Sequence, residues 1–170
     1  GEDFFAAMLI KTLDGMSAGQ VLDGSDGGFF RHCAQPDWTQ PQHEKMLEDN
    51  LGLAREFLDA AILLDRPQYR EMAKQTINYL MSQLYDSAAS GFRGSQGAHS
   101  EYFSLSPDRR AEETPPALDP SCYANGNALA VTVPLDAAWK LGDVSLQTTA
   151  LQVLDRLDSM AQAGTFSHVY

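Results

Sequence analysis

Apolar residues recur every three or four positions along most of the chain, and this periodicity constrains the fold more than any other feature. One run begins at Leu47, a second follows Asp65 and Pro67, and a third follows Asp143. The apolar positions are Leu47, Leu51, Ala54, Leu58 and Ala61; Tyr69, Met72, Ile77, Leu80 and Leu84; and Leu146, Ala150, Val153, Leu157 and Met160. Such spacing lines one face of a helix. The pattern predicts amphipathic helices, and no alternating stretch predicts a strand.

Two more helices are expected. Residues 4–13 carry the apolar set Phe4, Phe5, Met8, Leu9 and Leu13. The stretch from Asn127 to Leu141 is also apolar, but Pro134 interrupts it. An interior proline removes a helical hydrogen bond and costs about 3 kcal/mol, so it predicts a kink or a late helix start. In the second run, Asp65 is predicted to cap the helix, with Pro67 in its first turn.

The chain contains an internal repeat. Two segments share a capping Asp, about five turns of helix, and then a Gly and a Phe; Asp143 follows Asp65 by 78 residues, and Phe166 follows Phe92 by 74. Phe29 or Phe30 occupies the equivalent place near the start. A helix pair cannot bury its apolar stripe alone, so recurring pairs predict stacking into a larger helical assembly with the loops at one end. Residues 86–126 form the longest connector, which favours a functional or mobile role.

Composition excludes several classes of protein. The net charge of -11, with no basic cluster, disfavours a nucleic-acid partner. No stretch approaches the roughly 20 apolar residues of a membrane span. Cys33 and Cys122 lack paired spacing, which favours reduced thiols and the cytoplasm. The opening GEDFF resembles the middle of a helix, so we expect a fragment whose natural start and targeting signal lie elsewhere.

The loop and helix start at residues 27–50, GGFFRHCAQPDWTQPQHEKMLEDN, hold the chemical groups. If Glu44 and Glu48 are both helical they share a face, where like charges raise each other's pKa, as a general acid requires. Alternatively, they are solvated carboxylates that stabilise the positive end of the helix dipole. His32, Cys33 and His43 would bind a metal only if folding brought them together, so no metal or other cofactor is expected. A depressed thiol pKa at either cysteine would favour a redox role.

Aromatic residues crowd the predicted loops. They are Phe29, Phe30, Trp38, Tyr102, Phe103 and Tyr123. Such rings either wall a pocket for sugars and other flat apolar faces or plug the end of a helical bundle. The sequence pattern leaves both interpretations open.

The same residues resemble the YyaL-type, spermatogenesis-associated protein family, in which a thioredoxin-like domain is fused to a six-hairpin, glycosidase-like α/α toroid. In the loop, the matching residues are Gly27, Gly28, Phe29, Arg31, Trp38, Pro41, Glu44, Lys45, Met46, Leu47, Asp49 and Asn50. GFRGSQGAHSEYFSL matches at Gly91, Phe92, Gly94, Ser95, Gln96, Ala98, Glu101 and Tyr102, and DPSCYANGNA matches at Asp119, Pro120, Tyr123, Asn127 and Ala128.

The resemblance implies an all-α fold: an incomplete α/α toroid of about five helices, with long loops at one end. We expect a single partial-toroid domain over residues 1–170, without the family's thioredoxin-like domain. Three departures bear on activity. Gln42 replaces the family's His, with His43 one position later; Gly97 and His99 replace two aspartates; and Gly126 replaces a Trp.

Together these features predict a domain that binds a small polar or carbohydrate-like ligand, with weak or lost catalysis. The alternative is a working carbohydrate-active hydrolase or isomerase that uses Glu44 with Asp49 or Glu101. The ligand-binding candidates are Arg31, Trp38, His43, Gln96, His99, Tyr102, Tyr123 and Asn127. Expected partners are the ligand, the family's thioredoxin-like domain and a second copy of the chain.

Overall fold

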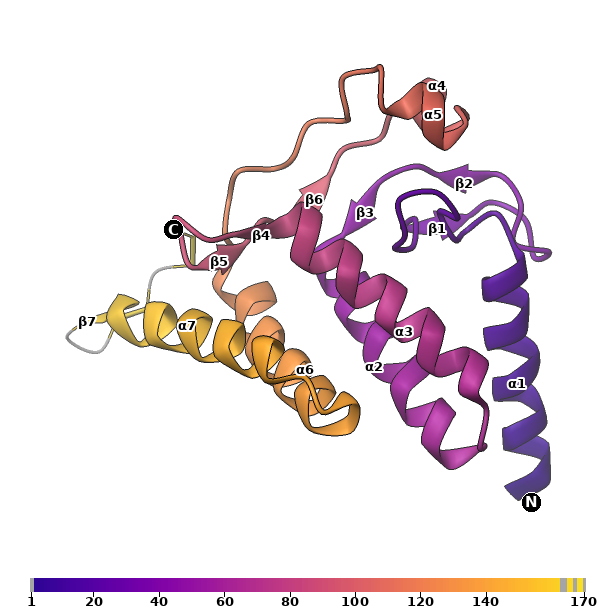
Figure 1. Ribbon diagram of the computed structural model, residues 1–170, viewed down its shortest axis with the longest axis horizontal. Coiled ribbons are helices and arrows are strands. Elements are labelled where there is room, and N and C mark those ends of the chain that lie inside the picture. Colours follow the sequence, from indigo (N-terminus) through magenta and orange to yellow (C-terminus); the bar gives the residue numbers. More distant parts are fainter. Residues whose placement is uncertain (1, 163–164, 167, 170) are drawn as a thin grey trace.

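The computed structural model describes residues 2–162, 165–166 and 168–169, and these are mostly helical (Figure 1). The five long helices are α1 (Glu2–Ala18), α2 (Leu47–Leu63), α3 (Pro67–Tyr79), α6 (Ala124–Leu141) and α7 (Val144–Met160). A π-helical turn, η1 (Leu80–Leu84), extends α3, and two one-turn helices, α4 (Ser100–Phe103) and α5 (Pro107–Arg110), lie in the long connector. No helix in this described part of the chain is long and apolar enough to cross a bilayer.

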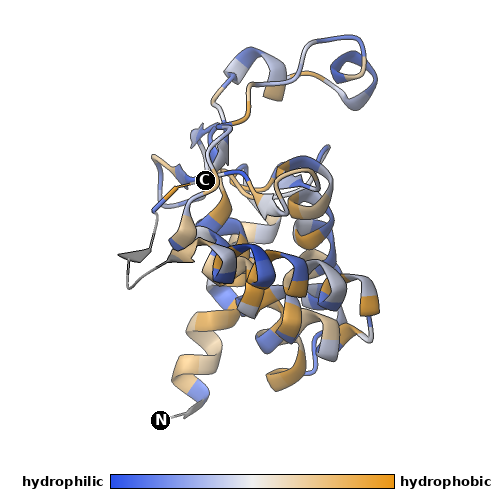
Figure 2. Ribbon diagram, turned by 90° about the vertical axis from the view of Figure 1, so that its left-hand side faces the viewer, coloured by the Kyte–Doolittle hydropathy of each residue, from blue (hydrophilic) through white to orange (hydrophobic). Residues whose placement is uncertain are grey.

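Two helical hairpins form the body. Helix α2 packs on α3, α6 packs on α7, and α2 and α6 contact each other between the two pairs. The apolar faces predicted from periodicity are the buried faces: Leu47, Leu51, Ala54 and Leu58 of α2 are buried, as are all five predicted positions of α7. Helix α1 forms as predicted, and Figure 2 shows it as a largely apolar ribbon beside the N-terminal label. Phe4, Phe5 and Met8 on it are nevertheless exposed, whereas Leu13 is buried.

The helix ends follow the sequence only in part. Asp143 caps α7 as predicted, and its Oδ1 accepts a hydrogen bond of 2.9 Å from the Ser145 amide. The cap predicted at Asp65 is wrong: Arg66 is the N-cap of α3, and Asp65 adopts a positive φ of 52° in the turn before it. Of the two effects predicted for Pro134, a kink or a late start, the late start is wrong, because α6 begins at Ala124 and contains Pro134.

Four antiparallel pairs of two-residue strands tie the loops together. They are β1 (His32–Cys33) with β2 (Pro41–Gln42), β3 (Lys45–Met46) with β6 (Ser95–Gln96), β4 (Tyr85–Asp86) with β5 (Gly91–Phe92), and β7 (Ala161–Gln162) with β8 (Thr165–Phe166). The β3–β6 pair joins the loop before α2 to the loop before α6. The glycine–aromatic loops therefore gather at one end of the hairpins, as the repeat predicted (Figure 1).

The long connector forms an excursion that we call the arm, residues 97–117. A bridge between Gln96 and Leu118 and a hydrogen bond of 2.8 Å from the Gly97 amide to the Ala117 carbonyl close its base. Helices α4 and α5 lie in it, beyond the strands and away from the helical hairpins (Figure 1). Figure 2 shows the same separation after a quarter turn.

Two asparagines at equivalent positions of the internal repeat make the same hydrogen bonds. Asn50, in the first turn of α2, accepts from the Phe29 amide (2.7 Å) and donates to the Phe29 carbonyl (3.0 Å). Asn127, in the first turn of α6, makes the same two bonds to Phe92, at 2.6 and 2.9 Å. Each asparagine also donates to the carbonyl four residues before it. The two repeats thus fix each glycine–aromatic loop to the helix that follows it.

Candidate functional site

Three of the predicted site residues from the first loop and the start of α2 meet around a hollow beside the first turns of α2, here called the α2 hollow. Its volume is about 500 Å³. It is lined by Met16, Val21, Phe30, Arg31, His32, Cys33, Trp38, Glu48, Asp49, Gly52 and Leu53. Three of the predicted residues, Arg31, Trp38 and Asp49, therefore share one concave surface.

Glu44 does not line the α2 hollow, but it is paired with Arg31, which does. The Arg31 guanidinium lies 2.9 Å from Glu44 Oε2, and the Arg31 amide donates to the Glu44 carbonyl at 2.7 Å. Glu44 precedes β3 and is not helical, so the helical face that the sequence suggested for Glu44 and Glu48 does not exist. Glu48 lies in the first turn of α2, where Oε1 accepts a hydrogen bond from Asn125.

Among the candidate catalytic residues, Asp49 has a carboxyl whose pKa is raised. Desolvation raises the pKa of Asp49, while Arg31 opposes the rise and Glu44 adds to it. Because Glu44 affects the pKa of Asp49, the two carboxylates interact electrostatically. The sequence predicted a carboxyl with a raised pKa in a pair of helical glutamates. In the structure, a carboxyl with a raised pKa is instead found at Asp49.

Trp38 forms one wall of the hollow by packing against α1. A Cβ added at Gly15 would lie 2.6 Å from Trp38 Nε1, and one added at Gly19 would lie 2.4 Å from Trp38 Cβ. The two glycines therefore allow the tryptophan to approach the helix closely. Trp38 remains half-buried. The part of the Trp38 ring that packs against α1 is covered, so only the rest of the ring can contact a ligand.

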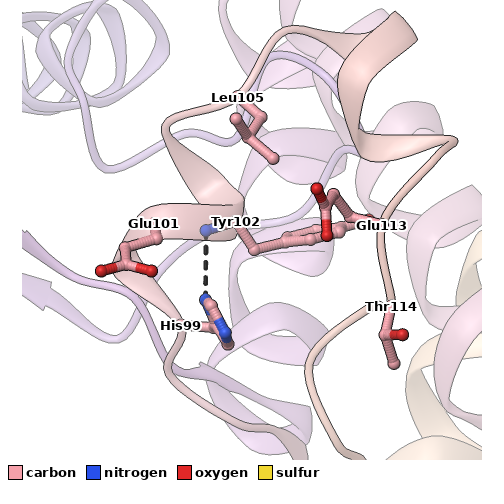
Figure 3. Close-up of a pocket in the computed structure, with 6 residues that line it drawn as sticks. All are labelled: His99, Glu101, Tyr102, Leu105, Glu113 and Thr114. Carbon is pink, nitrogen blue, oxygen red and sulfur yellow. Dashed lines mark hydrogen bonds between the residues drawn. The ribbon is translucent and has the colours of Figure 1, made fainter.

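Glu101 and His99 lie elsewhere, around a hollow of about 300 Å³ on the arm (Figure 3). Figure 3 shows Glu101 pointing away from Tyr102 and Glu113. His99 caps α4, because its Nδ1 accepts a 3.1 Å hydrogen bond from the Tyr102 amide. The residues lining the α2 hollow do not include Glu101, so the fold does not bring the three candidate catalytic carboxylates together in one cavity.

His43 is enclosed by aromatic rings rather than by the α2 hollow. Its ring stacks on Phe103 at 5.8 Å and meets the edge of Phe30 at 4.8 Å, and Nδ1 lies 3.1 Å from Ser100 Oγ. Burial lowers the pKa of His43; Asp23 opposes the decrease, and the cations Arg110 and Lys45 add to it. The folded protein therefore favours a neutral imidazole at this position.

Stability is expected to depend on the protonation of His43. Because the folded pKa lies below the ordinary value of about 6.5, its stabilising effect is complete above that value and decreases as the pH falls through it. Chemical denaturation at pH 7 and pH 5 should show a smaller decrease in unfolding free energy for His43→Gln than for the wild type. His32→Gln, at an exposed histidine in the same loop, is the control and should keep the wild-type difference. An unchanged decrease in His43→Gln would contradict this assignment.

Two predicted ligand-binding residues are structural. Asn127 is fully buried, and its amide is occupied by backbone groups. Gln96 is also buried: it lies in β6 and accepts a 3.3 Å hydrogen bond from Tyr79. Asn127 thus bonds to the backbone through both its amide atoms, and Gln96 accepts from Tyr79 through Oε1. Tyr102 is buried against Phe103, and half-buried Tyr123 packs over Gly94 at the start of α6.

Sequence reasoning missed a buried ionic cluster. Lys45 Nζ lies 2.7 Å from Asp23 Oδ2, and Arg110 Nη1 contacts both Asp23 oxygens (2.9 and 2.8 Å) and Asp26 (2.8 Å). Burial would raise the pKa of Asp23, but Lys45 and Arg110 together hold it below its ordinary value. Burial lowers the pKa of Lys45, whose side chain is completely enclosed. In the sequence, Lys45 stood out only as one of the residues that match the family's loop.

The thiols do not have the property that a redox role requires. Cys33 and Cys122 are unpaired, and burial raises the pKa of both. A raised pKa lowers the thiolate fraction and hence the reactivity. Within the described ranges, no three His, Cys, Asp or Glu side chains converge to hold a metal ion.

The comparisons with solved structures define the class of fold. The protein superposes on D-mannose isomerase with a TM-score of 0.74 (16% identity, 99% of this chain and 39% of that one). For cellobiose 2-epimerase from Spirochaeta thermophila the TM-score is 0.69 (24% identity, 88% and 34%). For a family 76 glycoside hydrolase (mannosidase) from Bacteroides thetaiotaomicron it is 0.61 (13% identity, 85% and 35%). The fold is therefore an incomplete α/α toroid of the glycosidase and epimerase type, as predicted.

The sequence comparison identifies the relatives. The chain is 31% identical over 93 residues to spermatogenesis-associated protein 20 of Homo sapiens, and 33% identical over 95 residues to the uncharacterized protein B0495.5 of Caenorhabditis elegans. Each match covers 55% of this chain but only 12% or 13% of the relative. No protein-family model matches the sequence. The chain is thus similar over about half of its length to spermatogenesis-associated protein 20, and this match, together with the toroid-type fold, confirms the predicted resemblance.

Proposed function

We propose that the protein binds a small polar or carbohydrate-like ligand in the α2 hollow, with weak or lost catalysis. The supporting observation is the meeting of Arg31, Asp49 and Trp38 around one hollow of about 500 Å³. A guanidinium and a carboxylate hydrogen-bond hydroxyl groups, and an aromatic wall contacts the apolar face of a sugar ring. This volume is within the usual range for small-molecule sites.

The structural neighbours support the ligand class. Their names describe an isomerase and an epimerase of sugars and a mannosidase. At these levels of identity the likeness concerns the fold alone, so carbohydrate binding by this chain rests on the α2 hollow.

Weak or lost catalysis is proposed because the three candidate catalytic carboxylates, Glu44, Asp49 and Glu101, do not line one hollow. Glycoside hydrolysis uses two carboxyl groups about 5–9.5 Å apart. Glu101 lies on the arm, Glu44 is paired with Arg31, and Gly97 and His99 carry no carboxylate. The alternative, a working hydrolase or isomerase, is favoured by the electrostatic interaction of Glu44 with Asp49, with Asp49 as the acid.

Besides the ligand, two protein partners are proposed. The surfaces for the family's thioredoxin-like domain or for a second copy of the chain are the exposed apolar residues of α1 and of the α6–α7 hairpin, among them Phe4, Phe5, Trp139 and Val144.

Thermal unfolding with D-mannose, cellobiose and small organic acids tests the binding proposal. We expect at least one of them to raise the midpoint in a concentration-dependent way, because a ligand stabilises the state that binds it. Arg31→Met should weaken that effect about tenfold or more, whereas Arg109→Met, at an exposed arginine of α5, should not. The absence of stabilisation by every compound would contradict the proposal.

Product analysis on the same samples separates the two functions. Stabilisation without a product supports a binding domain, whereas formation of an epimer, a ketose or a hydrolysed glycoside supports the enzyme. In the second case, Glu44→Gln and Asp49→Asn should each abolish turnover while leaving the unfolding midpoint nearly unchanged. Turnover unaffected by both substitutions would rule out this carboxylate pair.

A further inference from the structure

A second concave surface lies between the first loop and the arm, here called the arm cleft. Its volume is about 620 Å³. One wall comes from Gln20–Ser25 and Gln40–His43, and the other from Phe103–Leu105 and Arg110 of the arm. The two walls are far apart in sequence, and they are held together by the ion pairs of Arg110 with Asp23 and Asp26. Phe30 lines both this cleft and the α2 hollow.

Arg110, a buried lining residue of this cleft, has an unused donor. Its relative exposure is 6%, Nη1 is held by Asp23 and Asp26, and Nη2 donates to the Phe103 carbonyl. Its Nε is buried and has no hydrogen-bond partner among the described residues. A buried N–H without an acceptor is unfavourable, so an acceptor atom from a ligand would stabilise it here.

The lining specifies the chemistry of that ligand. The charged side chains in the lining are Asp23 and Arg110, which pair with each other, so the surface has no net charge to offer an ion. The remaining polar groups are uncharged: the amides of Gln20 and Gln40, the hydroxyls of Ser25 and Ser104, and the His43 imidazole. Apolar contact comes from Phe30, Phe103, Leu22, Pro41 and Leu105.

We propose that the arm cleft is a second binding site, separate from the α2 hollow, for a neutral polyhydroxylated ligand of one or two sugar rings. An oxygen of the ligand accepts from Arg110 Nε, and its ring faces lie against Phe30 and Phe103. Because Asp23 and Arg110 are already paired, a carboxylate or an ammonium group on the ligand would lose its hydration without gaining an unpaired counter-charge. Binding here also adds contacts between the arm and the first loop.

Two glycines provide matched blocking variants. Gly24 lines the arm cleft and Gly52 lines the α2 hollow. An added Cβ would meet nothing within 4 Å at either position, and neither residue has a positive φ. Gly24→Trp therefore fills the arm cleft, and Gly52→Trp fills the α2 hollow, without a clash at the point of attachment. Each variant leaves the other site as it is.

The experiment follows backbone amide shifts in the ¹⁵N-labelled chain during titration with cellobiose. Cellobionate and the glucosamine disaccharide are the anionic and cationic probes of similar size. In the wild type, cellobiose should shift the amides of Gly24, Ser25 and Ser104, and the two charged probes should bind there at least tenfold more weakly. Gly24→Trp should weaken these shifts at least tenfold, and Gly52→Trp should leave them unchanged.

Three results would overturn the second site. The first is a titration in which no probe shifts those amides in the wild type. The second is loss of the shifts in Gly52→Trp. The third is equal or tighter binding by a charged probe. Because the wild-type titration is decisive by itself, the test does not depend on the folding of either variant. Shifts confined to Gly52 and its neighbours would support the α2 hollow while contradicting the arm cleft, so the two proposals can fail separately.

Discussion

Replacing Asp23 with alanine is expected to lower the free energy of unfolding by about 3–5 kcal/mol, the usual effect of removing one partner from a buried ion pair. Asp23 is 3% exposed and neutralises two buried cations, Lys45 and Arg110. Without it, Lys45 keeps the Gly27 carbonyl and three aromatic rings, whose centroids lie 4.5–5.3 Å from Nζ. Rings stabilise a cation only partly, so the enclosed charge remains largely uncompensated.

Urea denaturation of the wild type and Asp23→Ala measures this difference. Glu71→Ala is the control: it breaks the exposed pair with Lys74, which has a similar N–O distance of 2.9 Å, and should change stability by less than about 1 kcal/mol. The pH dependence has a definite sign. Because the pKa of Asp23 is lowered in the folded state, its contribution is present above about pH 4 and is lost only as the pH falls through the folded value. The contribution from titration of the Asp23 carboxyl itself should therefore be the same at pH 6 and pH 8. A value within 1 kcal/mol of the control would show that the cluster contributes little.

The helical hairpins could be predicted because their determinants are local. Each long helix carries its own apolar period, and the burial of one face follows from the pairing of successive helices. The helix ends were less predictable. Asp65 is a residue type that often caps helices, but it occupies a turn with positive φ. Helix α6 continues through Pro134 because its other residues sustain the helix. Tertiary packing decides such positions, and a single sequence does not show it.

The same difference between local and long-range determinants applies to the candidate site. Arg31, Trp38, Glu44 and Asp49 belong to one loop and the helix turn after it, so closeness in sequence becomes closeness in space. Glu101 belongs to the arm, whose position depends on the contact between Arg110 and Asp23, 87 residues apart. Periodicity contains no information about that contact. The bonds of Asn127 to the backbone of Phe92 are likewise long-range contacts that the sequence pattern does not show.

The two equivalent asparagines lead to the second large prediction. Asn127→Ala should destabilise the fold by about 3 kcal/mol or more, because it leaves the buried amide and carbonyl of Phe92 without their side-chain partner, and each unsatisfied group costs about 1–3 kcal/mol. Asn50→Ala should have an effect of similar size through Phe29. Asn125→Ala, two residues away on the same helix, removes only an exposed bond to Glu48 and should change stability by less than about 1 kcal/mol.

Aspartate substitutions distinguish this double hydrogen bond from simple loss of packing. Asn127→Asp keeps an oxygen that accepts from the Phe92 amide but loses the donor to the Phe92 and Tyr123 carbonyls, and it places a buried negative charge beside two carbonyl oxygens. If the geometry matters, Asn127→Asp should be at least as destabilised as Asn127→Ala, despite having nearly the same volume as asparagine. Urea denaturation of the four variants measures this. If Asn127→Asp is as stable as the wild type, or if Asn127→Ala is no worse than Asn125→Ala, the paired asparagines do not anchor the glycine–aromatic loops to their helices.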